Sequence, residues 1–314
     1  MSSSEPLDIK NYIGLTSDTP IRFIASDVDG TLVNDAKSVG PEVVSAVRAA
    51  RESGIRVAIA SGRAWHEMDD VIDAMPCLRY FVCTNGAYVM DKEGKKELVH
   101  ISFDKTRAID LVRKLMTYGV FVEAYVKAEI FGQYPTVGNE TLQAERFFRP
   151  NIRPFILKTR TMVPDLLAHL ESLPEGPEKI QIFYGDERIR ERILADLRDD
   201  FQGAATDGKG RERFYDVLES SEGNLEFVLP HTTKGTAVEA LANHWGYTPD
   251  EVMTIGDSEN DLSMIRFAGA SVAMGNARDN VKAAARYETT DNNNYGVARA
   301  LYSAIAHNRE LEGK

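Results

Sequence analysis

Two aspartates, Asp27 and Asp29, stand one residue apart at the end of a short apolar run, IRFIASDVDGTLV, at residues 21–33. Carboxylates this close repel each other unless a cation or a proton neutralises one of them. The pair therefore indicates a bound divalent metal, a raised pKa on one carboxyl group, or both. Asp-Gly-Thr is also ordinary turn chemistry, so a polar turn after a strand is the alternative interpretation.

Three other stretches place polar side chains after an apolar run or at the start of a helical pattern. They are Ser61 with Gly62, Lys234, and Asp257 with Asn260 and Asp261. In open α/β sheets, ligands bind beyond the carboxyl ends of the strands. These side chains are therefore expected to gather with Asp27 and Asp29 at one edge of a sheet.

The surrounding pattern predicts the elements that would position these residues. Apolar runs predict strands at 21–28, 55–60, 80–83, 225–229, 251–255 and 271–274. Helical stripes predict helices at 41–53, 64–74, 234–245, 278–286 and 295–307. Strands that alternate with helices are typical of an α/β fold with a Rossmann-like parallel sheet and right-handed crossovers.

The rhythm changes between residues 89 and 223, where candidate strands and helices mix and several links are hairpin-like or rich in glycine and proline. We interpret this stretch as a separate α+β domain inserted into the first. The sequence thus predicts a catalytic core at 21–88 plus 224–314, an inserted domain at 89–223, and a loose N-terminal lead-in at 1–20.

Composition narrows the classes of function. A chain of 314 residues suits two domains, and a net charge of -11 disfavours nucleic-acid partners. No signal peptide is evident, and no apolar stretch reaches the roughly 18 residues of a membrane helix. The two cysteines, Cys77 and Cys83, indicate buried thiols in a reduced cytoplasm. The sequence does not predict the oligomeric state.

Together, these residues resemble the four ordered motifs of the haloacid dehalogenase superfamily of phosphotransferases. The supporting stretches are TNGA at 84–87, LEFVLPHTTKG at 225–235, IGDSEND at 255–261 and VAMGNA at 272–277. They are similar to the Cof-type branch, in which an α/β cap is inserted between the serine and lysine motifs. The resemblance implies a Mg²⁺-dependent phosphatase of small phosphorylated metabolites, such as sugar phosphates, that acts through an aspartyl-phosphate intermediate.

Phosphoryl transfer gives each residue type a role. It requires a nucleophile in line with the leaving oxygen and positive charge around the phosphoryl oxygens. Asp27 would attack phosphorus. Asp29 would be the general acid and then the general base, which requires a pKa raised toward neutrality.

The remaining roles follow from the same resemblance. Hard oxygen ligands suggest Mg²⁺, with the ligand set Asp27, Asp29 and Asp257. The expected phosphate-binding residues are Ser61, Gly62, Lys234 and Asn260. Asp261 and Thr31 would orient these groups, and Asn85 and Arg63 would line the substrate pocket.

Alternative functions differ in what they require of the site. Dehalogenase members lack the second aspartate, and ion-pump relatives need membrane helices and a DKTGT motif. A phosphosugar mutase remains an alternative because it uses the same aspartate pair. A catalytically idle sensor of a phosphorylated ligand is the alternative from another class, although it would not need Asp29.

The substrate is the least determined feature. Sugar phosphates, a flavin or pyridoxal phosphate and nucleotide fragments all suit the branch. In the inserted domain, a basic stretch and three polar side chains are candidate contacts, with a solvated face or ordinary strand residues as the alternative: Arg146, Arg149, Arg153 and Lys158, and Glu123, Tyr125 and Tyr134. The chain departs from the family pattern at Ser258 and at DNNNYG, residues 291–296, and neither change touches the catalytic set.

Overall fold

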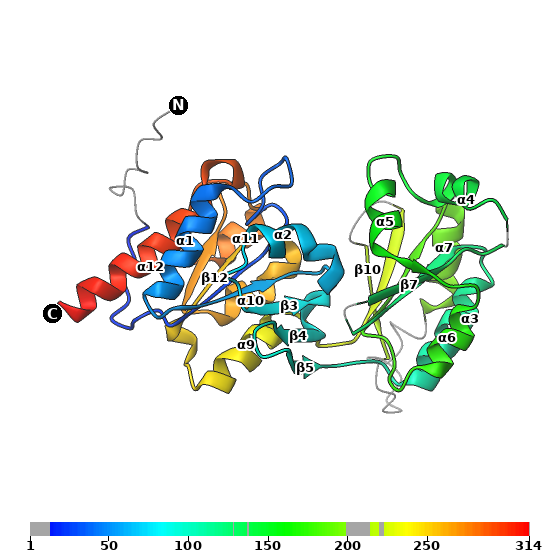
Figure 1. The fold of residues 1–314 in the computed structure, drawn as a ribbon, viewed down its shortest axis with the longest axis horizontal. Coiled ribbons are helices and arrows are strands. Elements are labelled where there is room, and N and C mark those ends of the chain that lie inside the picture. The colour runs from blue at the N-terminus through cyan, green and yellow to red at the C-terminus, as the bar shows by residue number, and fades with distance from the viewer. Residues whose placement is uncertain (1–12, 128, 137, 199–213, 220–222, 314) are drawn as a thin grey trace. The chain divides into compact units, whose positions relative to one another are not determined.

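The computed structural model describes residues 13–127, 129–136, 138–198, 214–219 and 223–313. Two compact units share the chain (Figure 1). The first unit contains Met1–Arg63, Met68–Val99 and Thr233–Lys314, and the second contains Ala64–Glu67 and His100–Thr232. Each unit is built around one sheet.

An eight-stranded sheet forms the centre of the first unit, in the order β14-β13-β12-β1-β2-β3-β4-β5. Its strands are β1 (Phe23–Ser26), β2 (Arg56–Ala60), β3 (Tyr80–Cys83), β4 (Tyr88–Asp91), β5 (Lys96–His100), β12 (Val252–Gly256), β13 (Ala270–Ala273) and β14 (Tyr287–Glu288). The pairs from β14 to β3 are parallel, and β4 returns antiparallel to β3. All four residues of β1 are buried, as expected for a central parallel strand covered on both faces.

Helices of the first unit accompany this sheet. They are α1 (Pro41–Glu52), α2 (Asp69–Ala74), α9 (Lys234–Trp245), α10 (Leu262–Phe267), α11 (Asp279–Ala284) and α12 (Gly296–Glu312). Short 3₁₀ turns occur at Trp65–Met68, Thr84–Gly86, Pro249–Glu251, Glu259–Asp261 and Asn292–Asn294. Helices α1 and α12 lie side by side (Figure 1). The predicted α/β fold with a Rossmann-like parallel core is confirmed.

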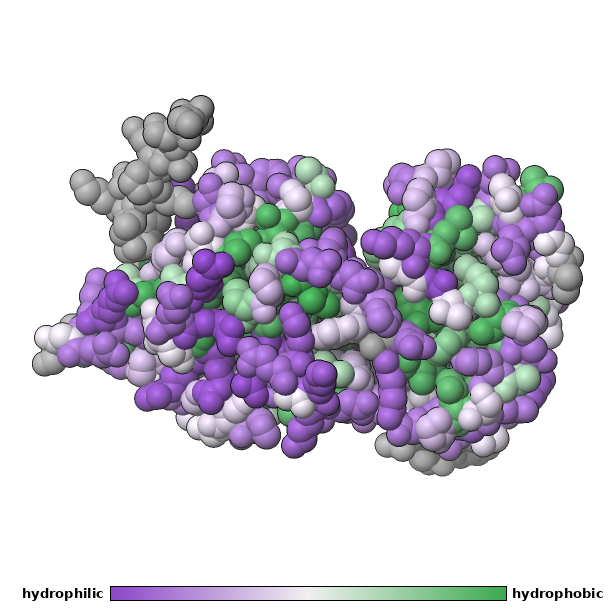
Figure 2. Space-filling view, in the orientation of Figure 1, coloured by the Kyte–Doolittle hydropathy of each residue, from purple (hydrophilic) through white to green (hydrophobic). Residues whose placement is uncertain are grey.

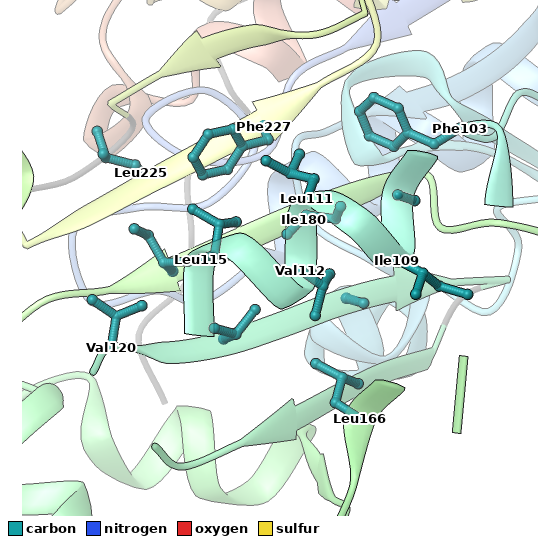
Figure 3. Packing of buried hydrophobic residues seen from close by; sticks show 14 of the residues in the cluster. Phe103, Ile109, Leu111, Val112, Leu115, Val120, Leu166, Ile180, Leu225 and Phe227 are labelled. Atoms are coloured by element: carbon teal, nitrogen blue, oxygen red, sulfur yellow. The ribbon is translucent and has the colours of Figure 1, made fainter. Parts of the chain in front are cut away.

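The second unit has a six-stranded sheet of order β10-β11-β9-β6-β7-β8. Its strands are β6 (Phe121–Val126), β7 (Glu129–Gln133), β8 (Thr161–Met162), β9 (Lys179–Phe183), β10 (Asp216–Leu218) and β11 (Asn224–Val228). Its helices are α3 (Lys105–Met116), α4 (Glu140–Phe147), α5 (Arg153–Thr159), α6 (Leu166–Ser172) and α7 (Glu187–Asp196). Figure 3 shows α3 side chains such as Leu111 and Leu115 among apolar strand residues such as Ile180 and Phe227, which gives this unit its own core.

The boundaries of the inserted unit differ from those expected at residues 88 and 224. The hairpin β4–β5 extends the core sheet, so the first unit runs on to Val99. Strand β11, which we expected in the core, instead pairs with β9 and β10 in the second sheet. An apolar strand pattern shows that a strand is buried but not which neighbour it pairs with, and this explains the difference.

The described part of the N-terminal segment, residues 13–20, is tied down where we expected a loose lead-in. The Ile13 amide donates to the Ser303 hydroxyl at 2.8 Å, and the His307 ring lies 3.1 Å from the Thr19 carbonyl oxygen. Residues 1–12 lie outside the described residues. Among the described helices, none is long and apolar enough to cross a membrane. The visible face of each unit is mostly hydrophilic, with apolar residues in patches (Figure 2).

Candidate active site

The central parallel strands β1, β2 and β12 are each followed directly by a polar residue, namely Asp27, Ser61 and Asp257. Strand β1 lies between β2 and β12, and the Asp27 amide continues its ladder by donating to the Ile255 carbonyl at 3.0 Å. Asp27 and Ser61 are 3% and 2% exposed. The sheet therefore holds a carboxylate and a hydroxyl, both buried, at its carboxyl edge, as the sequence predicts.

Lys234 joins the ends of two strands through buried ion pairs. Its Nζ lies 2.6 Å from Oδ1 of Asp27 and 2.7 Å from Oδ1 of Asp261, and the side chain is 1% exposed. Lys234 opens α9 behind Thr233, whose side chain and that of Thr236 form a reciprocal capping box. The cap fixes the start of the helix and so fixes the direction of the lysine.

Burial and a neighbouring carboxylate both oppose the negative charge of Asp27. Burial raises the pKa of the Asp27 carboxyl well above its usual range, and the charge of Asp261 adds to this, although Lys234 opposes it. Burial also raises the pKa of Asp257, against a hydrogen bond from Thr31. Burial lowers the pKa of Lys234, but the charges of Asp261 and Asp27 outweigh it and raise that pKa. This edge of the sheet thus has an excess of negative charge.

Three carboxylates here could hold a metal ion. Oxygen atoms of Asp27, Asp257 and Asp261 lie within 4.8 Å of one another. Gly30 has φ +79°, and a Cβ built on it would lie 2.6 Å from the Asp257 carboxylate, so a larger residue there would be strained and would displace the Asp257 side chain. Three carboxylates offer hard oxygen donors, and burial raises the pKa of two of them, Asp27 and Asp257. Such a group fits a divalent cation such as Mg²⁺, because a cation would offset the mutual repulsion of the carboxylates.

Asp261 is the most constrained of these carboxylates. Its Oδ1 accepts from Lys234, and its Oδ2 accepts from the Asp257 and Ser258 amides, both at 3.0 Å. The Thr31 hydroxyl donates to Oδ1 of Asp257 at 2.8 Å. Asp261 thus contacts Lys234, and Thr31 contacts Asp257. The orienting role that we expected of these two residues stays a prediction.

The Asp29 side chain does not join the metal-binding group. Arg63 donates to it twice, from Nε at 2.8 Å and Nη2 at 2.7 Å, and the Lys37 ammonium lies 3.3 Å away. Burial raises the pKa of Asp29, but these two cations outweigh it and lower that pKa. We expected a raised pKa for a general acid, so this arrangement differs from the prediction. A role for Asp29 as metal ligand stays a prediction.

Three of the expected phosphate-binding residues, Ser61, Gly62 and Asn260, lie around Asn85. The Ser61 carbonyl accepts from the Asn85 amide at 3.0 Å, and a Cβ on Gly62 would lie 3.1 Å from the Asn85 side chain. Asn260 donates to Asn85 Oδ1 at 3.3 Å, which links this turn to the Asp257 turn. Asn85 has a left-handed backbone with φ 53°. The structure therefore brings these four residues into one neighbourhood.

Sequence reasoning missed two features of this site. Lys37 lies in a polar loop that matches no motif, so only its distance to Asp29 reveals it. Arg63 was expected to line the substrate pocket, yet it binds Asp29 and also lies 3.5 Å from Asp70. No pattern of spacing along the chain signals either contact.

Two of the polar candidates of the inserted unit, Glu123 and Tyr125, bind each other in a buried network. The Glu123 carboxylate accepts from the Tyr125 hydroxyl at 2.9 Å and from Arg160 at 3.0 and 3.1 Å, and Arg160 also pairs with Glu67 at 2.6 Å. All four side chains are buried. They form a structural network, and Arg153 likewise donates to the Phe148 carbonyl at 3.3 Å.

Comparison with known proteins agrees with this geometry. Residues 24–301 match the model of the haloacid dehalogenase-like hydrolases, and the chain belongs to that family. The chain is 30% identical over 290 residues to Phosphatase YwpJ of Bacillus subtilis, covering 90% of this chain and 99% of that protein. It is 28% identical to Putative phosphatase YxeH of the same organism, with coverages of 90% and 98%.

Solved structures of haloacid dehalogenase-like hydrolases also resemble this chain. A haloacid dehalogenase-like hydrolase from Bacteroides thetaiotaomicron superposes with a TM-score of 0.74 at 27% identity, covering 90% of this chain and 98% of that one. A second such hydrolase, from B. subtilis, gives a TM-score of 0.70 at 26% identity, with coverages of 90% and 99%. The predicted superfamily and the assignment as an enzyme of the hydrolase class are confirmed.

Proposed function

We propose that this hydrolase is a Mg²⁺-dependent phosphatase that cleaves phosphate monoesters of small metabolites through an aspartyl-phosphate. The observation that carries the proposal is the buried contact of Lys234 with Asp27 at the carboxyl end of β1. Lys234 uses only one oxygen of Asp27, so the other carboxylate oxygen remains as a nucleophile. Relatives named as phosphatases support this reaction type.

The residues of the candidate site would carry each step of phosphoryl transfer. An oxygen of Asp27 forms a bond to phosphorus, and the bond from phosphorus to the leaving alkoxide breaks. Ser61, Gly62 and Lys234 bind the phosphoryl oxygens, with Asn260 near them, and offset the charge that develops there. Mg²⁺ bound by Asp27 and Asp257 would supply further positive charge to the phosphoryl group.

Asp29 carries the proton transfers. It protonates the leaving alkoxide and then takes a proton from the water that attacks phosphorus and releases Asp27. The first transfer requires Asp29 to hold a proton and to turn from Arg63 toward the leaving group, because the ion pair favours its charged form. Opening of the pair is therefore part of the proposed cycle.

The proposed substrates form a broad class. Relatives include a pyridoxal phosphate phosphatase from Escherichia coli at 27% identity and a 5-amino-6-(5-phospho-D-ribitylamino)uracil phosphatase from B. subtilis at 27% identity. We propose small phosphorylated metabolites of this general kind, with sugar phosphates among them, as substrates. A cytoplasmic location stays a prediction.

The test is phosphate release from a panel of phosphorylated metabolites, measured with Mg²⁺ and then with a chelator. Chelator-sensitive release by the wild type, absent in Asp27→Asn, is the expected result. Release that persists in Asp27→Asn would contradict the mechanism. Isomerisation of a phosphosugar without release would identify a mutase, and tight binding without any reaction would identify a sensor.

A further inference from the structure

The loop that follows the two catalytic aspartates carries a lysine in an unusual backbone conformation. Lys37 has φ 58°, in the left-handed region, and its amide donates to the Asn34 carbonyl at 2.8 Å. A side chain with a Cβ is strained there, and glycine would adopt the conformation more readily. Strain of this kind persists where the surrounding structure enforces it, often at functional sites.

Side chains from a distant loop hold the start of the loop that carries Lys37. Both carboxylate oxygens of Asp35 accept hydrogen bonds, one from Asn292 at 3.1 Å and one from Asn293 at 3.0 Å, and the Asp35 amide donates to Asn293 Oδ1 at 3.2 Å. Asn292 also donates to the Val33 carbonyl at 3.1 Å. We call Asp35, Asn292 and Asn293 the asparagine clasp. These asparagines lie in the DNNNYG stretch at residues 291–296.

The clasp presents the Lys37 ammonium at the rim of the site. The ammonium lies 3.3 Å from Oδ1 of Asp29, yet 65% of the Lys37 side chain is exposed. Arg63 already binds both oxygens of Asp29 at shorter distances. Lys37 is therefore not needed to satisfy Asp29. Within the described part of the chain, Asp29 is its only hydrogen-bond acceptor, which leaves donors of the ammonium directed to solvent.

We infer that Lys37 is a specificity-determining residue that binds a second anionic group on the leaving part of the substrate. The inference rests on the proposed function, because there Asp29 marks where the leaving oxygen lies. A carboxylate or a second phosphate a few bonds from the ester oxygen would reach the ammonium and form a charge-assisted hydrogen bond. Among phosphorylated metabolites, the site favours those whose alcohol part carries such an anion.

The experiment compares two phosphonates that differ in this one feature. Phosphonoacetate carries a carboxylate beside its phosphonate, whereas methylphosphonate does not, and neither contains the ester bond that a phosphatase cleaves. Their dissociation constants are measured by calorimetry with Mg²⁺ for the wild type and for Lys37→Gln. We expect the wild type to prefer phosphonoacetate by about tenfold, and Lys37→Gln to reduce that preference below about twofold.

Two matched variants separate charge from backbone effects. Lys37→Arg keeps a cation and retains the preference. Lys95→Gln serves as the control, because Lys95 is also an exposed lysine with positive φ, at 45°, in the turn between β4 and β5 of the same unit. Lys37→Gly relieves the backbone strain, so it raises the melting temperature while the preference is lost.

The outcomes are distinct. An equal affinity of the wild type for both phosphonates, no binding of either, or an unchanged preference in Lys37→Gln would overturn the inference. If the preference depends on Lys37 but the wild type releases no phosphate from any metabolite, the proposed function fails while the anion site stands.

Discussion

At the scale of single residues, the site places one lysine between two buried carboxylates. Lys234 contacts Asp27 and Asp261, and all three side chains are at most 5% exposed. Such an arrangement adds little net stability, because desolvation offsets the attraction, but removing one partner leaves charge buried without compensation. The triad is better explained by its orientation of Asp27 for chemistry than by stability.

Replacement of Lys234 tests this account of the triad. We expect Lys234→Met to lower the free energy of unfolding by about 3–5 kcal/mol at neutral pH, because two buried carboxylates then face each other. Urea unfolding measures the loss. The double variant Lys234→Met with Asp27→Asn should recover part of it, since one of the two charges is gone. Wild-type stability in Lys234→Met would contradict the account.

Ionisation of Asp27 should lower the free energy of unfolding, whereas ionisation of Asp29 should raise it. The folded-state pKa of Asp27 is raised, so its charge costs stability above that pKa, and the cost vanishes as pH falls below the unfolded value of about 4. The folded-state pKa of Asp29 is lowered, so its contribution is present above the unfolded value and is lost as pH falls through the folded pKa.

Replacement of each aspartate by asparagine tests these two effects on stability. Without Mg²⁺ at neutral pH, Asp27→Asn should raise the free energy of unfolding by about 1–3 kcal/mol. Asp29→Asn should lower it by about 1 kcal/mol or less, because this carboxylate is partly exposed and solvent screens its ion pairs. Urea unfolding at pH 7 and at pH 4 measures both effects. Equal signs for the two variants would contradict the pKa assignments.

How far the sequence predicts the site depends on the kind of contact. Residues that end strands or start helices, such as Asp27, Ser61 and Lys234, could be predicted because strand ends share one edge of a parallel sheet. The Arg63 to Asp29 ion pair and the Lys37 contact could not, since loop conformation decides them. The asparagine clasp is of the same kind, because it joins loops more than 250 residues apart.

At the scale of elements, Gly86 sets how closely the turn after β3 approaches the start of α9. Its φ is +106°, and a Cβ there would lie 2.3 Å from the Thr233 carbonyl oxygen. Thr233 is the N-cap residue before Lys234. This contact therefore connects the turn that carries Asn85 with the helix that begins at Lys234.

We expect Gly86→Ala to lower the free energy of unfolding by more than backbone strain alone would. Gly54→Ala is the matched control, because Gly54 also has positive φ, at +83°, but nothing lies within 4 Å of the position that a Cβ would take there. We expect Gly54→Ala to cost about 1–2 kcal/mol of unfolding free energy. Gly86→Ala should cost more and should also reduce phosphate release. Equal losses of stability with unchanged phosphate release would contradict the role given to this contact.

The elements also show where sequence patterns stop being informative. Helix starts at Pro41 and Lys234 could be predicted because proline and capping residues act locally. The sheet that β11 joins could not, because its apolar pattern fits either core. Pairing of β11 with β9 is a long-range contact, so it can be recognised only in the folded structure and not from the local sequence.

At the scale of the whole molecule, the two units have separate cores, and the candidate metal-binding carboxylates lie in only one of the described units. The described carboxylates that could share a metal ion, Asp27, Asp257 and Asp261, all belong to the first unit. The second unit packs α3 and α6 on its own sheet around residues such as Leu115 and Leu166 (Figure 3). A cation bound at the site should therefore stabilise the first unit directly.

Hydrogen exchange with and without Mg²⁺ tests this division. At a concentration one hundred times the dissociation constant, Mg²⁺ should stabilise the metal-binding unit by about 2.7 kcal/mol. We expect slower exchange in β1 and β12, with no change in β6 and β9. Asp257→Asn is the control that should remove the effect. Equal protection of both sheets would contradict a metal site confined to the first unit.

The proposed mechanism requires Asp27 to become phosphorylated during turnover. The most direct measurement is acid quenching of the enzyme during hydrolysis of its best substrate, followed by mass spectrometry of the peptide that contains Asp27. We predict one phosphoryl group on that peptide in the wild type and none in Asp27→Asn. Rapid phosphate release without a phosphorylated peptide, or with the phosphoryl group on another residue, would contradict the mechanism.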